Sequence, residues 1–210
     1  MVDRRDIRTD RSLDLSRGVP TKMAEGGRRS SPRMVGFPYR GGYRYHLVFT
    51  TKSFGRVLRD AWAELAVTEL HAAALATGFS LDAYCVMPDH VHVLVAGDAA
   101  LDSNLKGFAH RFKQALGFKF KQATGNALWH RSYYDHVVRD QEPMIAHLAY
   151  ILANPVAAGL VETPDAWRYS GPHNALEEVS AAMVDRSKDL SVRVAKLARE
   201  FGDHASGGSS

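Results

Sequence analysis

The chain has 210 residues, of which 45% are hydrophobic and 24% are charged, a composition typical of one globular domain with additional end segments. A single cysteine, Cys85, excludes a disulfide framework within the chain and is typical of a reducing compartment. No apolar run reaches 18 residues and no apolar segment follows the N-terminal arginines, so we expect no contact with a membrane and no secretory signal.

The net charge of +4 is distributed unevenly. Residues 1–33 carry nine basic and five acidic side chains, which already account for the whole excess. Residues 104–139 carry seven basic side chains against one acid. Such a local excess favours a polyanionic partner, although the solvated face of a helix has the same composition. These seven residues are Lys106, Arg111, Lys113, Lys119, Lys121, Arg131 and Arg139.

The hydrophobic pattern alternates between period 2 and period 3.6 in the middle of the chain. In chain order it predicts a strand at 43–50, a helix at 58–77, strands at 79–87 and 90–96, a helix at 103–122, an extended segment at 128–138, and helices at 141–153 and 176–202. Residues 1–36 have no sustained period. We therefore expect a disordered basic arm at 1–36, a single domain at 37–175, and a C-terminal helix with a flexible tail at 176–210.

The order of the expected elements is β-α-β-β-α-β-α. This order is typical of an α+β protein in which an antiparallel sheet carries its helices on one face, the split βαβ or ferredoxin-like arrangement.

The expected strand at 90–96 begins with two histidines, His90 and His92, separated by one valine. Residues two apart on a strand project from the same face, about 7 Å apart along the chain. Two imidazoles side by side on a rigid strand can form half of a site for a divalent cation. The alternative is a pair of partly exposed strand histidines without a metal.

The expected helix at 141–153 carries Tyr150, with Asn154 four residues later and therefore on the same face. A phenol is a weak nucleophile because its ordinary pKa is about 10, and a nearby cation would ease formation of the phenolate. The pattern therefore favours metal-assisted phosphoryl transfer. The alternative is that Tyr150 only packs in the helix interface and Asn154 only ends the helix before Pro155.

The combination of these features resembles a known family. The segment 84–92 (YCVMPDHVH) looks like the HUH segment (histidine, bulky apolar residue, histidine) of the single-tyrosine transposases. The segments 128–140, 147–156, 158–161 and 167–170 resemble, in the same order, the stretch before the tyrosine helix, that helix and its exit. The set of motifs covers about residues 43–172 and is similar to the REP-associated tyrosine transposases.

This resemblance implies the HUH endonuclease fold and a specific chemistry. It implies that Tyr150 is the nucleophile, that His90 and His92 bind Mg²⁺ or Mn²⁺, and that Asn154 is a third ligand. The implied reaction cleaves and rejoins hairpin-containing single-stranded DNA through a 5′-phosphotyrosine intermediate. The seven basic residues of 104–139 would bind DNA phosphates. We accordingly expect a REP-like palindrome as partner, a monomer or homodimer, and a place in the bacterial cytoplasm, associated with the nucleoid.

Three other functions use similar residues. A histidine-triad nucleotide hydrolase requires a third histidine where this chain has Leu94. A replication initiator or plasmid relaxase usually has a different order of the histidines and the tyrosine, or a helicase domain. A non-catalytic hairpin DNA- or RNA-binding protein of the same fold would keep the basic helix and would tolerate loss of the Tyr150 hydroxyl.

Overall fold

The structure is a computed structural model and describes residues 36–139, 144–177 and 179. A five-stranded antiparallel sheet forms its centre, with the strand order β4-β1-β3-β2-β5. The strands are β1 (Arg44–Thr50), β2 (Phe79–Val86), β3 (His90–Gly97), β4 (Tyr134–Val138) and β5 (Ser170–Gly171). The helices are α1 (Ala61–Ala76), α2 (Leu105–Thr124), α3 (Met144–Leu152) and α4 (Asn154–Ala157). Short 3₁₀ turns lie at Lys52–Phe54 and Pro164–Ala166. The antiparallel α+β fold is therefore confirmed.

Helix α2 has clear signals at both ends. The side chain of Asn104 accepts hydrogen bonds from the backbone N–H groups of Lys106 and Gly107, and this caps the first turn. Gly125 follows the last turn with φ of 74°, a left-handed conformation that glycine adopts at low cost. Between these ends the apolar side chains recur every three or four residues and are buried against the sheet.

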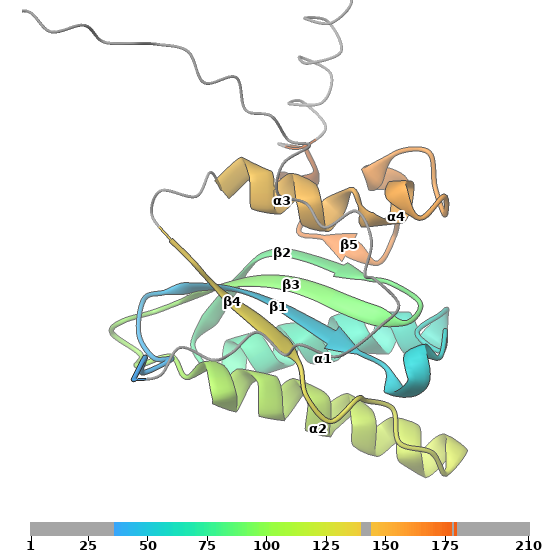
Figure 1. Cartoon of the computed structure of the whole chain (residues 1–210), viewed down its shortest axis with the longest axis horizontal. Coiled ribbons are helices and arrows are strands. Elements are labelled where there is room, and N and C mark those ends of the chain that lie inside the picture. The colour runs from blue at the N-terminus through green and yellow to red at the C-terminus, as the bar shows by residue number, and fades with distance from the viewer. Residues whose placement is uncertain (1–35, 140–143, 178, 180–210) are drawn as a thin grey trace, which may run out of the picture.

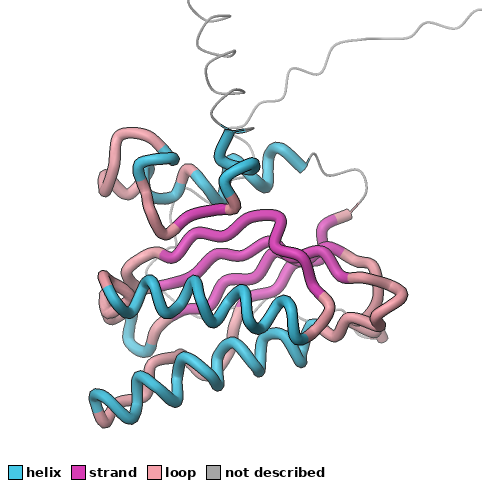
Figure 2. The backbone as a smooth tube through the Cα atoms, turned by 180° about the vertical axis from the view of Figure 1, so that it is seen from behind, coloured by secondary structure: helices cyan, strands magenta, loops and turns pink. Residues whose placement is uncertain are grey.

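Alternation along the strands divides the core into two clusters. Side chains on one face of the sheet, including Phe49 and Val93, pack against α1 and α2. Side chains on the other face, including Cys85 and Leu94, pack against α3. Figures 1 and 2 show α1 and α2 on one side of the sheet and α3 on the other.

The position of α3 differs from the expectation that the helices lie on one face. The long helices α1 and α2 do share a face, but α3 covers the opposite one. The reason is that Ala83 and Cys85 of β2 and Leu94 of β3 form an apolar surface on that face. This surface and the apolar side chains of α3 cover each other. Strand β5, which extends the sheet beyond β2, was not predicted because it has only two residues.

The predicted N-terminal arm and C-terminal helix lie almost entirely outside the described residues. Residues 1–35 and most of 176–210 lie outside the described residues, and so do residues 140–143 at the expected start of the tyrosine helix. Among the described helices, none has the length and apolarity needed to cross a bilayer.

Gly97 at the end of β3 lies under the chain segment that leads into β1. A Cβ atom at Gly97 would lie 2.1 Å from the carbonyl oxygen of Gly41, a backbone atom that cannot yield without moving the segment. At the neighbouring Gly42, the nearest atom to a Cβ would be 3.6 Å away, an ordinary contact.

We therefore expect Gly97→Ala to lower the free energy of unfolding by about 2 kcal/mol or more, because overpacking forces the backbone to shift. Gly42→Ala is the matched control and should change the unfolding free energy by less than about 0.5 kcal/mol. Denaturant unfolding measures both. Equal effects of the two substitutions would contradict the close approach at Gly97.

Candidate active site

Three histidines and one tyrosine meet on the face of the sheet that α3 covers. His90 and His92 come from β3, His46 comes from β1, and Tyr150 comes from α3. The pairing of β1 with β3 aligns Val48 with His92 and His46 with Leu94, so His46 lies diagonally across from His92 on the same face. Sequence analysis indicated His90, His92 and Tyr150 but missed His46, because a single histidine in an apolar strand carries no pattern.

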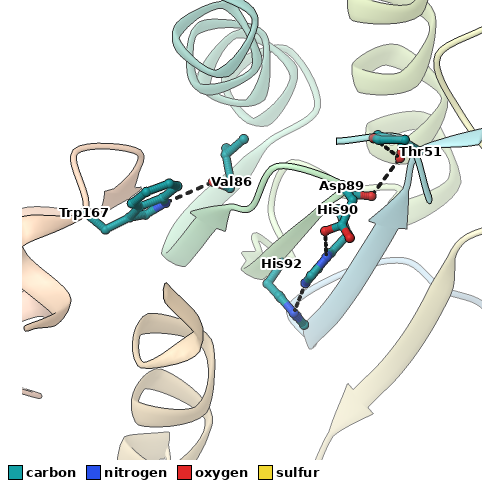
Figure 3. A network of polar contacts seen from close by, with 7 residues as sticks. Thr51, Val86, Asp89, His90, His92 and Trp167 are labelled. Atoms are coloured by element: carbon teal, nitrogen blue, oxygen red, sulfur yellow. Dashed lines mark hydrogen bonds and ion pairs between the residues drawn. The ribbon is translucent and has the colours of Figure 1, made fainter. Parts of the chain in front are cut away.

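The histidine rings form a chain of polar contacts that begins at Asp89. The Nδ1 atom of His90 lies 2.6 Å from a carboxylate oxygen of Asp89. The Nε2 atoms of His90 and His92 are 3.1 Å apart, and the Nδ1 atom of His92 lies 3.2 Å from the Nε2 atom of His46. Figure 3 shows the first part of this chain, from Asp89 through His90 to His92.

The turn that carries Asp89 is held in place from two sides. The hydroxyl and backbone N–H groups of Thr51 both donate to the carbonyl oxygen of Asp89, at 2.9 and 3.0 Å. The backbone N–H of Leu58 donates to the carbonyl of Pro88, and the indole N–H of Trp167 donates to the carbonyl of Val86 (Figure 3). These bonds fix the start of β3 and therefore the directions of His90 and His92.

Tyr150 lies against two of the histidines. Its ring centroid is 5.7 Å from that of His46 and 5.6 Å from that of His92, in both cases in an edge-on arrangement. Burial raises the pKa of Tyr150 above its usual value of 10, and the nearby Tyr134 adds to this effect. The phenol is therefore protonated at neutral pH.

Burial also keeps two of the histidines uncharged. It lowers the pKa of His46 to about 3, with smaller contributions from His147 and His136. It lowers the pKa of His92 well below its usual value, with contributions from His90 and His46. The hydrogen bond from His90 lowers the pKa of Asp89, so this carboxylate stays ionised and accepts the bond. Neutral imidazoles keep a lone pair that can bind a cation.

The His90 and His92 pair fits a divalent cation. In both rings the Nδ1 atom contacts a neighbour, Asp89 or His46, and the two Nε2 atoms converge at 3.1 Å. Nitrogen ligands about 2.1 Å from an octahedral cation lie about 3 Å apart along one edge. In the part of the chain that the structure describes, no three His, Cys, Asp or Glu side chains form a metal-ligand group.

Asn154 lies at the start of α4, one turn after Tyr150. Its side-chain nitrogen donates to the backbone carbonyls of Tyr150 and Ile151, at 2.6 and 3.2 Å. The amide therefore caps the end of α3, and its predicted part in a metal site remains a prediction.

The basic residues predicted to bind DNA lie mainly on α2, on the opposite side of the sheet from Tyr150. Lys113 and Lys119 contact other parts of the protein. The ammonium of Lys113 donates to the backbone carbonyls of His130 and Arg131, at 2.9 and 3.1 Å, and Lys119 pairs with Glu69. Burial lowers the pKa of Lys113. These two lysines hold α2 to neighbouring segments. Lys119 is nevertheless exposed, as are Lys106, Arg111, Lys121, Arg131 and Arg139.

A groove of about 620 Å³ runs along α2 beside the segment that precedes β4. Charged and aromatic side chains line it together. The lining residues are Lys106, Ala109, His110, Lys113, Gln114, Trp129, His130, Arg131 and Tyr133.

The three aromatic residues near the start of β4 differ in how far their rings are exposed. Trp129 packs against Phe112, with ring centroids 5.5 Å apart, and its indole nitrogen is buried. Tyr133 is half-buried against Phe49, at 5.4 Å, whereas Tyr134 is 40% exposed. Trp129 and Tyr133 are partly buried because the segment that precedes β4 closes the core beside α2.

The model of the family described as "Transposase IS200 like" matches residues 40–154, which is 115 of the 210 residues. The chain belongs to the IS200-like transposase family. The matched range includes His46, His90, His92 and Tyr150, and ends at Asn154.

Two relatives of this IS200-like transposase are named as REP-associated tyrosine transposases. The protein of Haemophilus influenzae is 32% identical over 109 residues, which are 45% of this chain and 60% of the relative. The protein of Escherichia coli is 26% identical over 140 residues, which are 62% of this chain and 81% of the relative. The match thus spans only 60% of the Haemophilus protein.

A solved structure of a REP-associated tyrosine transposase bound to a REP hairpin has the same fold. It aligns with a TM-score of 0.54 at 20% sequence identity, covering 72% of this chain and 84% of the other. The likeness in fold agrees with the sequence matches to the two relatives, and these sequence matches confirm the predicted resemblance to the REP-associated tyrosine transposases.

The low pKa of buried His46 predicts that this IS200-like transposase loses stability in acid. As the pH falls below about 6.5, the unfolded chain binds a proton at this position, whereas the folded chain does not until about pH 3. Between pH 7.5 and 5.5 we expect His46 to reduce the free energy of unfolding by about 1 kcal/mol.

Urea unfolding at the two pH values measures this loss. His46→Gln should have a smaller loss than the parent, whereas His110→Gln, at an exposed position, should have the parental loss. If the parent and His46→Gln lose stability equally, His46 is not the group that titrates.

Proposed function

We propose that this chain is a metal-dependent tyrosine transposase that cleaves and rejoins hairpin-containing single-stranded DNA. The observation that carries the proposal is the position of Tyr150, whose ring lies against His92 in a histidine chain suited to a cation. Membership of the IS200-like family supports the DNA substrate. In this proposal residues 37–175 form the catalytic domain.

The proposed reaction is a transesterification. The hydroxyl oxygen of Tyr150 attacks a backbone phosphorus atom, a new tyrosine–phosphorus bond forms, and the bond from phosphorus to the 3′ oxygen breaks. Overall, one proton passes from the phenol to the departing 3′ oxygen. The products are a 5′-phosphotyrosine and a free 3′-hydroxyl. A 3′-hydroxyl can reverse the step, so the bond is exchanged without a nucleotide cofactor.

Mg²⁺ or Mn²⁺ is the proposed cofactor, held by His90 and His92 with Asn154 as a candidate third ligand. When bound, such a cation withdraws negative charge from a non-bridging phosphate oxygen and favours the phenolate. The protein's own residues hold the reacting group: α3 packs through Leu148 and Ile151 on the sheet and so fixes the height of Tyr150 above the histidines. The neutral, buried rings of His46 and His92 exclude water from one side of the phenol.

The α2 groove is the proposed site for the DNA backbone. Lys106 and Arg131 supply exposed cations at its wall, and Tyr133 supplies a ring on which an unpaired base can stack. Arg111, Lys121 and Arg139 would extend the same basic surface. Lys113 and Lys119, which have protein partners, would shape the surface more than they contact DNA.

A route from this groove to Tyr150 passes over β4, the edge strand of the described sheet. At the start of β4, the side chains of successive residues point to opposite faces of the sheet. Tyr133 packs with the core under α2, whereas Tyr134 contributes to the raised pKa of Tyr150 on the other face. DNA that crosses this edge would meet both rings. A hairpin held at the groove with a single-stranded extension over β4 suits this path, and a related transposase is known in complex with a REP hairpin.

Tyr150→Phe tests the nucleophile, with a labelled single-stranded hairpin, Mn²⁺ and a denaturing gel as the assay. We expect the covalent protein–DNA adduct to fall by at least about 10³-fold, because no phenol oxygen is left to attack. Hairpin binding should change by less than about twofold, since the ring remains. Tyr134→Phe is the matched control, because this tyrosine is near Tyr150, and it should still form the adduct.

An adduct that persists in Tyr150→Phe and disappears in Tyr133→Phe or Tyr134→Phe would move the nucleophile to the start of β4. Hairpin binding by the parent without any adduct would favour the non-catalytic binding protein instead.

Replacing Lys106 and Arg131 with alanine together tests the groove. Each lost phosphate contact should lower the slope of log affinity against log salt concentration by about 0.7 for single-stranded DNA, hence by about 1.4 for the pair. Lys119→Ala is the control within α2, and it should change the slope less because Glu69 already neutralises this lysine. A parental slope in the double variant would show that the DNA lies elsewhere.

A further inference from the structure

His46 lies outside the His-x-His motif, yet it completes the polar surroundings of His92. It is 6% exposed and reaches His92 from β1, with 3.2 Å between its Nε2 atom and the Nδ1 atom of His92. Both ring nitrogens of His92 therefore have a histidine nitrogen as neighbour. An apolar side chain would fill the same position in the core without the cost of burying an imidazole.

We infer that His46 is a positioning residue that changes between hydrogen-bond donor and acceptor, which allows His92 to present a free Nε2 lone pair to a cation. This inference rests on the proposed metal site at His90 and His92.

Without a cation, the chain of contacts has one consistent arrangement of protons when all three imidazoles are neutral. The carboxylate of Asp89 can only accept, so the Nδ1–H of His90 donates to it and the Nε2 of His90 is left as an acceptor. The Nε2–H of His92 must then donate to His90, and its Nδ1 must accept from the Nε2–H of His46. All three contacts are hydrogen bonds in this arrangement.

With a cation, the same arrangement cannot persist, because a ligand nitrogen carries no proton. The proton of His92 has to move from Nε2 to Nδ1, and that Nδ1–H then needs an acceptor. His46 can become the acceptor if its own proton moves from Nε2 to Nδ1. One proton changes position in each of two rings, and no net charge is gained or lost.

A histidine suits position 46 better than a polar residue that can only donate or only accept a hydrogen bond. A hydroxyl is too short to reach across two strands, a lysine can only donate, and a carboxylate can only accept. An imidazole has one donor and one acceptor that exchange places. A glutamine amide has a comparable reach and also offers both a donor and an acceptor.

The test uses the full chain and measures the affinity for Mn²⁺ by calorimetry at pH 8. His46→Phe keeps a ring in the core but has no nitrogen, and we expect it to weaken Mn²⁺ binding by about 10- to 100-fold, as for other residues that orient metal-bound histidines. His46→Gln should bind Mn²⁺ within a few-fold of the parent. Parental affinity in His46→Phe, or an equal loss in His46→Phe and His46→Gln, would overturn the inference.

His90→Ala separates this inference from the proposed metal site. If His90→Ala binds Mn²⁺ like the parent, the metal site itself is wrong. If His90→Ala loses Mn²⁺ binding and His46→Phe does not, the metal site stands and only the role of His46 is wrong. Thermal unfolding of each metal-free variant is the control for folding.

A second measurement needs no variant that could fail to fold. In the ¹⁵N-histidine-labelled parent, two-bond nitrogen–proton correlations identify which nitrogen of each ring carries the proton. We expect His92 to carry it on Nε2 in the metal-free protein and on Nδ1 after one equivalent of Zn²⁺, a diamagnetic probe. A proton on Nδ1 of His92 in both states would overturn the change of roles at His46.

Discussion

The antiparallel pairing of β1 with β3 is the constraint on which the site depends. Paired residues of two strands share a face, so this register places His46, His90 and His92 together and turns Phe49, Val91 and Val93 away from them. A shift of one residue would send the histidines into the core under α1 and α2. The apolar face therefore does more than stabilise the sheet, because its burial determines which way the imidazoles point.

The sheet separates the two sites that the proposed function requires, one for catalysis and one for DNA binding. The histidines and Tyr150 lie on the side of α3, whereas the basic groove lies along α2 on the opposite side. Strand β4 is an edge of the sheet, and it lies close to both: Tyr133 lines the groove just before β4, and Tyr134 contributes to the raised pKa of Tyr150. Tyr134, the first residue of β4, and Tyr133, which precedes it, point to different faces for the same reason that the histidines share one.

Several residues of the proposed metal site and the proposed DNA groove have a structural task. Asn154 caps α3 through its amide, Lys113 ties α2 to the segment before β4, and Trp129 closes the core beside Phe112. Such contacts make the geometry of the site rigid. They also reduce the number of side chains that remain available for DNA, which concentrates the proposed phosphate contacts on exposed residues such as Lys106 and Arg131.

The sequence by itself determined the order of the main elements, the antiparallel α+β class and the family. Periodicity is a local property, and the HUH and tyrosine motifs are contiguous in the chain. The sequence could not show that α3 covers the second face of the sheet. Both faces of β2 and β3 carry apolar residues, so a helix could have packed on either one. The sequence also could not show that His46 contacts His92, or that Lys113 and Lys119 bind other parts of the protein. Their roles depend on partners 46, 17 and 50 residues away along the chain, and only tertiary packing brings such partners within hydrogen-bond distance.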